Sequence, residues 1–193
     1  MLGNLMKFEK IPGRAFLDTN SLNFILEYGE YIFDGVMISP KISSNRIIKD
    51  IDSFYNIFFT GKRASWQLAI SPFTFKEVIE TQDATKKHYL ENWFMEIWHY
   101  WLNILEENND LPTFVQAENT RIELLSSGIL DPLPDIEDRI LICDAIVYRC
   151  DCFCTRDWRT ILKYRTYLKS LPIKIITPSE WWDLIKPYAR LWT

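Results

Sequence analysis

Several features that would assign a chain of 193 residues to a common functional class are missing here. The sequence has no run of about 18 apolar residues, so no segment is predicted to span a bilayer. Its first residues lack the apolar stretch of a signal peptide. Lysine and arginine number 22 against 26 aspartates and glutamates, and this net charge of -4 argues against a protein that coats nucleic acid. We therefore expect a cytoplasmic, non-membrane protein that would need a local basic patch to bind nucleic acid.

Residues that typically bind zinc are also scarce. The chain has two histidines, and all four cysteines fall within a short stretch: Cys143, Cys150, Cys152 and Cys154. The last three alternate, so on a strand they would share one face, too closely spaced for ordinary disulfides among themselves. Their spacing also lacks the two-residue gaps of zinc ligands. We expect reduced thiols on a buried strand face.

What the chain does contain is ample core material. Apolar residues make up 48% of it and aromatic residues 15%, which suits one packed domain. The expected strands are 14–18, 66–71, 150–155 and 173–176; the expected helices are 19–31, 46–59, 72–107 with a break near 83, 113–127, 135–149, one beyond Asp157 and one from Pro178. Strands that alternate with helices predict a helix-covered parallel sheet.

Apolar residues also recur at helical spacing in the expected helix 72–107. They are Trp93, Phe94, Ile97, Trp98, Trp101, Ile104 and Leu105. This stripe is interpreted as part of the core, and a dimer or partner surface is the alternative.

Four acids stand near the expected carboxyl ends of the strands. Asp18 and Asp157 come at or just after strand ends, Glu77 lies early in the helix after strand 66–71, and Asp138 begins the helix before strand 150–155. Parallel strand ends share one edge of a sheet, so these acids can converge. Several carboxylates cannot stay ionised together without a cation, and Mg²⁺ and Mn²⁺ prefer oxygen ligands. The sequence therefore predicts a phosphate-cleaving metal site.

The segments around these acids resemble those of the PIN-domain family. They are Phe-Leu-Asp-Thr-Asn-Ser at 16–21, Ile-Ser-Pro-Phe-Thr-Phe-Lys-Glu-Val at 70–78, and Asp-Arg-Ile-Leu-Ile-Cys-Asp-Ala at 138–145 running on to Cys-Thr-Arg-Asp at 154–157. In that family the acids follow in the same order. The resemblance implies a single PIN-like domain over 1–193, a three-layer α/β/α fold with its core at about 14–177 and a helical insertion at about 82–130.

Carried over by position, the resemblance implies catalytic and metal-binding roles for Asp18, Glu77, Asp138 and Asp157, with Asn20 and Thr155 as polar supports. Glu80 is the rival of Glu77, but the Thr-Phe-Lys-Glu register favours Glu77. Asp144 occupies a helix position that the family usually gives to a small residue. It lies six residues after Asp138, about 240° round a helix, so we expect it to support the site from behind or to lie on the surface.

Members of that family hydrolyse RNA with a divalent metal, so the resemblance implies an endoribonuclease that uses Mg²⁺ or Mn²⁺ to neutralise phosphate charge and activate water. The resemblance also suggests that the protein is the toxin of a toxin–antitoxin pair, with an antitoxin as its partner. A homodimer is a further expectation. Arg156, Arg159 and Lys163 are the expected RNA contacts, with Trp158 as a stackable ring beside them. Arg159 and Lys163 are expected one helical turn apart.

Two other functions compete with this interpretation. The first is a catalytically silent PIN-like scaffold that binds RNA or a protein, against which the complete set of four acids speaks. The second is a Mg²⁺-dependent phosphohydrolase that acts on small phosphomonoesters through an aspartyl nucleophile. The segment Asp18-Thr-Asn lacks the second aspartate common in that chemistry.

Overall fold

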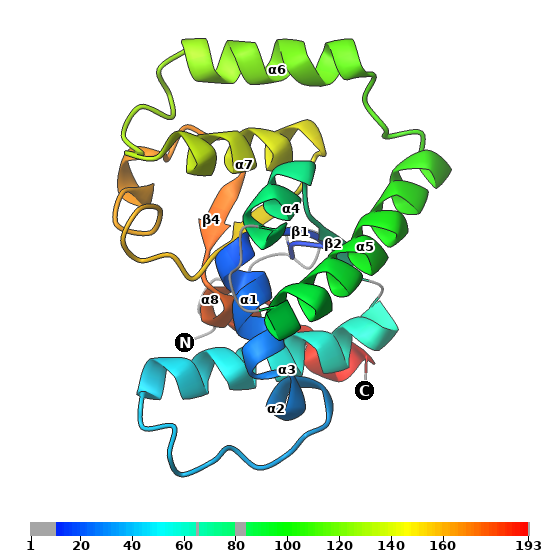
Figure 1. Cartoon of the computed structure of the whole chain (residues 1–193), viewed down its shortest axis with the longest axis vertical. Helices are drawn as coiled ribbons and strands as arrows, with labels where there is room; N and C mark the ends of the chain where they lie inside the picture. Colours follow the sequence, from blue (N-terminus) through cyan, green and yellow to red (C-terminus); the bar gives the residue numbers. More distant parts are fainter. Residues whose placement is uncertain (1–10, 65, 80–83, 193) are drawn as a thin grey trace.

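The computed structural model describes residues 11–64, 66–79 and 84–192, and it is a mixed α/β fold (Figure 1). The elements in chain order are β1 (Arg14–Leu17), α1 (Thr19–Glu27), α2 (Gly29–Phe33), α3 (Asn45–Ala64), β2 (Gln67–Ala69), α4 (Pro72–Ile79), α5 (Ala84–Glu107), α6 (Phe114–Ser126), α7 (Ile136–Val147), β3 (Cys152–Cys154), η2 (Arg165–Tyr167), β4 (Lys174–Ile176), α8 (Pro178–Ile185) and η3 (Lys186–Trp192). All four expected strands are present, each somewhat shorter than predicted.

The four strands form one parallel sheet in the order β2-β1-β3-β4. From β1 the chain moves to one side to form β2, and it later returns to place β3 on the other side of β1. The pair β1 and β3 is therefore the point where the direction of strand addition reverses. In open parallel sheets, ligands bind beyond the carboxyl ends of the strands at such a point. Leu17 pairs with Cys154 there, so Asp18 and Thr155 are the next residues on the two strands.

Helices cover both faces of this sheet, as a three-layer α/β/α arrangement requires. Successive strand residues point to opposite faces. Ala15 and Leu17 pack into a core cluster with residues of α1, α3 and α8, whereas Phe16 packs into a second cluster with residues of α7. The ring of Phe16 stacks on that of Phe153 in β3, with centroids 5.3 Å apart. The apolar run that predicted each strand is thus divided between two cores.

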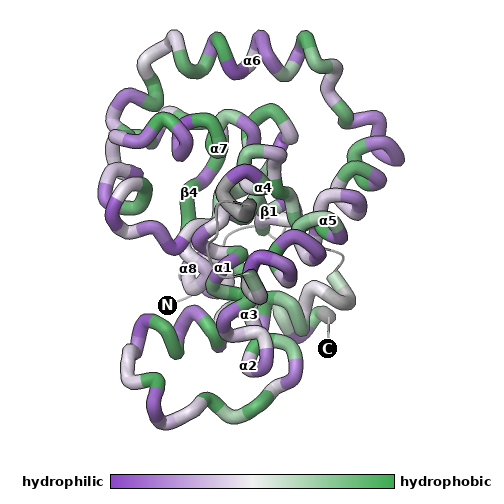
Figure 2. Tube along the Cα trace, viewed as in Figure 1, coloured by the Kyte–Doolittle hydropathy of each residue, from purple (hydrophilic) through white to green (hydrophobic). Residues whose placement is uncertain are grey.

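Local sequence signals explain where several helices begin. Asp135 caps α7 by accepting a hydrogen bond from the Glu137 N–H at 2.9 Å. Thr113 and Gln116 form a capping box at the start of α6, and Thr177 and Glu180 form another at α8. In Figure 2 hydrophobic and hydrophilic residues alternate along these helices, as expected for helices with one buried face.

The apolar stripe predicted in the helix 72–107 belongs to the core. That helix is divided into α4 and α5 across residues 80–83, which lie outside the described residues. On α5, Trp101 and Leu105 are fully buried, and Phe94 is 4% exposed. Among the described residues, no helix is both long enough and apolar enough to cross a membrane.

The helix predicted beyond Asp157 is wrong. Residues 158–164 form consecutive turns, and only the short 3-10 helix η2 follows them. The Asp157 side chain accepts the first two free backbone N–H groups of this segment, and the Leu162 N–H then bonds to the Asp157 carbonyl at 2.8 Å. A cap is therefore present, but the chain curls back towards β4 instead of continuing as an α-helix.

The four cysteines are free and buried. Cys152 and Cys154 lie on one face of β3, and Cys150 precedes the strand and packs in the other core cluster. Burial raises the pKa of both Cys152 and Cys154 well above its usual value, which keeps these thiols protonated and unreactive.

Candidate active site

Asp18 is the first acid beyond β1, and its side chain is fixed inside the molecule. The residue is 3% exposed and caps α1, with its Oδ1 accepting a 2.7 Å hydrogen bond from the Ser21 N–H. Its backbone N–H reaches the Cys154 carbonyl of β3 at 3.4 Å. The Ser21 hydroxyl donates to the same carbonyl at 3.1 Å. Sequence reasoning missed this second role of Ser21, although its place three residues after a capping acid is a recognisable signal.

Thr155 joins the ends of β1 and β3. Its hydroxyl donates a short hydrogen bond to Asp18 Oδ2 and accepts one from the Asp157 N–H at 2.9 Å. Its own N–H bonds to the Ile176 carbonyl of β4 at 2.9 Å. The threonine is fully buried, so the position of its hydroxyl is set by three strands. Thr155 therefore orients Asp18 directly and the Asp157 backbone at the same time.

Asp157 is the second acid at this edge of the sheet. Its Oδ1 accepts hydrogen bonds from the N–H groups of Arg159 at 2.7 Å and Thr160 at 2.8 Å. These bonds orient the carboxylate while Oδ2 takes part in neither of them. Unlike Asp18, Asp157 is only partly buried, so the pair presents one interior and one accessible carboxylate.

Burial raises the pKa of Asp18 to about 6, and the negative charge of Asp157 adds to the rise. Hydrogen bonds from Thr155 and Ser21 oppose it, but they do not outweigh the loss of water around the carboxylate. An acid held in this state is stabilised as a carboxylate by a nearby cation. The electrostatics of the pair therefore favour binding of a positive ion.

Asp138 is partly buried and occupies the third position of α7. Because α7 leads into β3, its first turn lies towards the edge of the sheet where the strands end. An ion pair of 2.8 Å between Lys76 of α4 and Glu137 of α7 brings the two helices together at that turn. Glu77 follows Lys76 on α4, but its side chain lies outside the described residues. Among the described side chains, no group of three or more His, Cys, Asp or Glu residues is placed to hold a metal ion.

Asp144 is not a surface acid. It is fully buried on α7, and its Oδ1 accepts a 2.6 Å hydrogen bond from Arg121 Nε of α6. Burial raises the pKa of Asp144, and the bond from Arg121 opposes this rise. Glu118 also pairs with Arg121. Of the two predicted positions for Asp144, the surface one is wrong, because α6 covers this side of α7 and brings Arg121 to the carboxylate.

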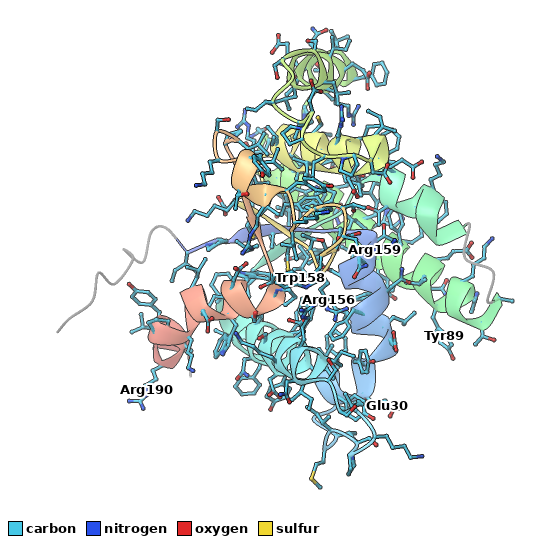
Figure 3. All side chains as sticks on the ribbon, turned by 90° about the vertical axis from the view of Figure 1, so that its left-hand side faces the viewer. Glu30, Tyr89, Arg156, Trp158, Arg159 and Arg190 are labelled. Atoms are coloured by element: carbon cyan, nitrogen blue, oxygen red, sulfur yellow. The ribbon has the colours of Figure 1, made fainter. Side chains whose placement is uncertain are left out.

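The expected basic residues divide into buried and exposed groups. Arg156 is largely buried, with its Nε 2.8 Å from Asp50 Oδ2 and its guanidinium carbon 3.5 Å from the centroid of the Phe24 ring. We therefore do not retain it as an RNA contact. Arg159 and Lys163 are exposed, although they lie in turns and not on one helical face. Asn20 is exposed in the first turn of α1. Figure 3 shows Arg159 beside α1, on the same side of the molecule as Arg156.

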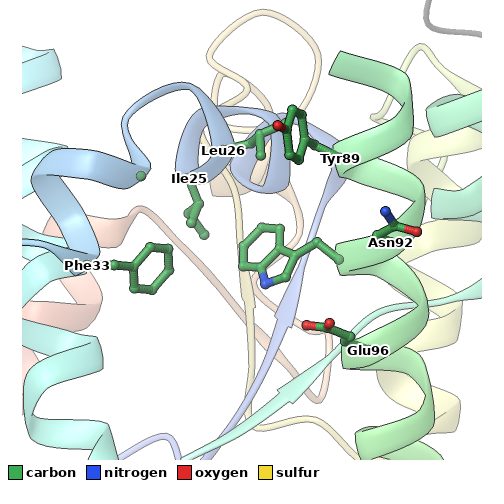
Figure 4. A pocket seen from close by; sticks show the side chains of 8 residues that line it. Ile25, Leu26, Phe33, Tyr89, Asn92 and Glu96 are labelled. Carbon is green, nitrogen blue, oxygen red and sulfur yellow. The ribbon is translucent and has the colours of Figure 1, made fainter. Parts of the chain in front are cut away.

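A cavity of about 350 Å³ lies elsewhere on α1 (Figure 4). Its walls come from the end of α1, from α2 and from α5: Ile25, Leu26, Gly29, Phe33, Tyr89, Asn92, Trp93 and Glu96. Asp18 caps the opposite end of α1, about 10 Å along the helix axis from Ile25. This mainly apolar cavity is therefore separate from the acids.

No family model, curated protein or solved structure matches this chain significantly. The arrangement of the strands and the geometry of Asp18, Thr155 and Asp157 are therefore the basis for assigning a function.

Proposed function

We propose that this protein is a divalent-metal-dependent endoribonuclease of the PIN-domain kind. The single observation that carries the proposal is the pair Asp18 and Asp157 at the reversal point of a parallel sheet, linked through the Thr155 hydroxyl. Two carboxylates at this edge of the sheet can hold a cation, and the cation can contact the phosphodiester that is hydrolysed.

The residues present are compatible with Mg²⁺ or Mn²⁺. Such ions accept oxygen ligands, and Mg²⁺ typically retains several waters while using one or two protein carboxylates together with substrate phosphate oxygens. Asp18 and Asp157 meet that need without a third acid, and carboxylate oxygens that accept one hydrogen bond retain a second lone pair. Burial is the main cause of the raised pKa of Asp18, the Asp157 charge adds to it, and a nearby cation would lower this pKa. A bound divalent ion would neutralise phosphate charge and activate water for hydrolysis.

The chain's own groups have separate tasks in this proposal. Thr155 and the Ser21 N–H keep both oxygens of Asp18 in position, and the N–H groups of residues 159 and 160 hold Oδ1 of Asp157. Glu77 and Asp138 are proposed to add carboxylates at this edge, for the ion or for a proton. The exposed cations Arg159 and Lys163 would bind RNA phosphates.

A PIN-like scaffold without catalysis is the second candidate. Such a scaffold would keep the same fold and the exposed cations Arg159 and Lys163 for RNA, without using a metal. For the ribonuclease, the resemblance extends the proposal to a toxin with an antitoxin partner, acting on RNA in the cytoplasm.

Cleavage of a mixed panel of RNAs tests the enzyme directly. Wild type is assayed with Mg²⁺, with Mn²⁺ and with chelator, beside Asp18→Asn and the control Asp52→Asn, which alters an exposed acid on α3. We expect cleavage that needs the metal, falls more than about a hundredfold in Asp18→Asn and persists in the control. RNA binding without cleavage would favour the scaffold, and activity only on a chromogenic phosphomonoester would favour the phosphohydrolase.

Metal binding can be measured without activity. An ion that binds only the folded protein raises its unfolding temperature, by an amount that grows with the logarithm of its concentration relative to its dissociation constant. Mg²⁺ or Mn²⁺ should therefore raise the unfolding temperature of wild type and of Asp52→Asn, but not that of Asp18→Asn. An equal rise in all three would place the ion elsewhere.

A further inference from the structure

Trp158 and Arg46 form a stacked pair beside the two acids. The guanidinium carbon of Arg46 lies 4.4 Å from the centroid of the Trp158 ring. Both residues are exposed, with 45% of Trp158 accessible. Exposed aromatic rings also occur elsewhere on this protein, but in Trp158 a cation lies over the ring of a residue that directly follows the acid Asp157. We call Trp158 and Arg46 the stacking pair.

The two residues come from distant parts of the chain, and a buried interaction holds them in place. Arg46 stands in the first turn of α3, and Asp50 follows one helical turn later on the same face. Asp50 pairs with Arg156, which is two residues before Trp158. The first turns of α3 thus contact the segment after β3 at two successive positions. The contact between Asp50 and Arg156 is largely buried, and the contact between Arg46 and Trp158 is exposed.

The stacking pair is adjacent to the proposed catalytic carboxylates. Trp158 directly follows Asp157, and the Arg159 N–H bond to Asp157 Oδ1 closes a tight turn around residue 158. In Figure 3 the labels of Arg156, Trp158 and Arg159 lie in one region of the molecule, away from Arg190. A strand whose phosphate reached Asp157 would therefore pass an aromatic face and exposed cations.

We propose that Trp158, supported by Arg46, stacks a nucleobase of single-stranded RNA next to the phosphate that is cut. The inference rests on the proposed nuclease function and adds to it a residue pair that contacts the substrate base. Every base has a face that can stack on an aromatic ring, so such a contact tolerates sequence variation. Bases inside a duplex are already stacked on one another and are not available to the ring. The stacking pair therefore selects unpaired RNA.

RNA binding without chemistry provides the first test. Labelled single-stranded RNA is titrated in chelator with wild type, with Trp158→Ala and with Trp158→Leu, which keeps apolar bulk but has no aromatic face. The control is Phe114→Ala, which removes an exposed aromatic ring on α6. Both Trp158 variants should bind about tenfold more weakly or worse, with the control unchanged. Their salt dependence should stay at the wild-type slope, because stacking releases no counterions.

Abasic RNA makes the test specific for stacking. Removing single bases in turn should weaken wild-type binding most at one position. The RNA that lacks this one base should bind Trp158→Leu as tightly as intact RNA does, because the ring and the base act as one interacting pair. Additive losses would overturn the proposal, as would equal affinity of wild type for single-stranded RNA and for the matching duplex. Unfolding curves of each variant show whether a loss of RNA affinity comes from misfolding. If it does, the proposal is judged from the abasic RNAs with wild type, and equal affinity for all of them would refute it.

The outcomes separate this inference from the nuclease itself. If wild type cleaves RNA while Trp158→Ala and Trp158→Leu bind it normally, the stacking pair is refuted and the enzyme stands. If binding depends on Trp158 and on one base but no metal supports cleavage, the nuclease is refuted and the stacking pair stands. A wild type that does not bind single-stranded RNA at low salt would refute both.

Discussion

Burial of the ionised Asp18 carboxylate should lower the free energy of unfolding. Its pKa is raised to about 6 by burial, against an ordinary value of 3.8 in the unfolded chain. Below pH 3.8 both states are protonated and Asp18 carries no penalty. As the pH rises towards 6, the unfolded state loses its proton more readily, so the free energy of unfolding falls. Above pH 6 this loss is complete. Asp18→Asn removes the penalty because an amide does not ionise.

The size of the effect follows from the pKa. A difference of about two pKa units corresponds to about 3 kcal/mol, at 1.36 kcal/mol for each unit. Asparagine is as good a helix cap as aspartate, so the bond from the Ser21 N–H persists. The Thr155 hydroxyl then faces an amide, and about 1 kcal/mol is subtracted for a weaker hydrogen bond. We expect Asp18→Asn to be more stable than wild type by about 2 kcal/mol at pH 7.

Urea unfolding in chelator from pH 4 to pH 8 measures this difference. The stability advantage of Asp18→Asn should be largest above pH 6 and should shrink as the pH falls towards 4. Asp52→Asn, at an exposed position on α3, controls for the loss of one negative charge. A variant that is less stable than wild type at pH 7, or an advantage that does not change with pH, would refute the electrostatic account of the site.

Two further substitutions test the packing of the fold, one beside the site and one at the end of α3. Arg156→Met leaves Asp50 buried without its ion-pair partner and should cost about 3 kcal/mol or more in urea unfolding, with part of the loss recovered when Asp50→Asn is added. No recovery would contradict the ion-pair explanation. Gly61→Ala places a methyl carbon 2.3 Å from Cδ1 of the Trp66 ring, and the expected overpacking of about 1–3 kcal/mol exceeds the gain of about 1 kcal/mol from better helix propensity. Gly29→Ala, whose nearest contact would be at 3.8 Å, should not show that loss, and equal effects at both positions would reject the steric argument.

Most of the fold could be predicted because it follows from local patterns. Apolar runs before Asp18 and Asp157 gave β1 and β3, and capping residues such as Asp135 and Thr177 marked helix starts close to the observed ones. The segment after Asp157 was the exception. A capping acid and a following charged stretch are typical of a helix, but here the chain forms turns and a short 3-10 helix before it reaches β4 at Lys174.

The site was less predictable, because burial and pairing depend on residues far along the chain. The order of the strands places Asp18 beside Thr155, and sequence reasoning could anticipate that meeting from the rule for parallel strands. It could not anticipate that Asp50 would neutralise Arg156, or that Arg121 would reach Asp144 from another helix. These partners are one helix or more away and carry no local signal. The same limit concealed Arg46 as a neighbour of Trp158.

The hydrogen bond from Thr155 to Asp18 spans 137 residues of sequence. Neither half of the chain can therefore build the acidic pair alone, because β1 is made early in synthesis and the β3 segment late. Until residue 157 has left the ribosome and β3 has paired with β1, the nascent chain carries the acids without their arrangement. The site proposed for RNA cleavage therefore forms only after most of the chain has been made.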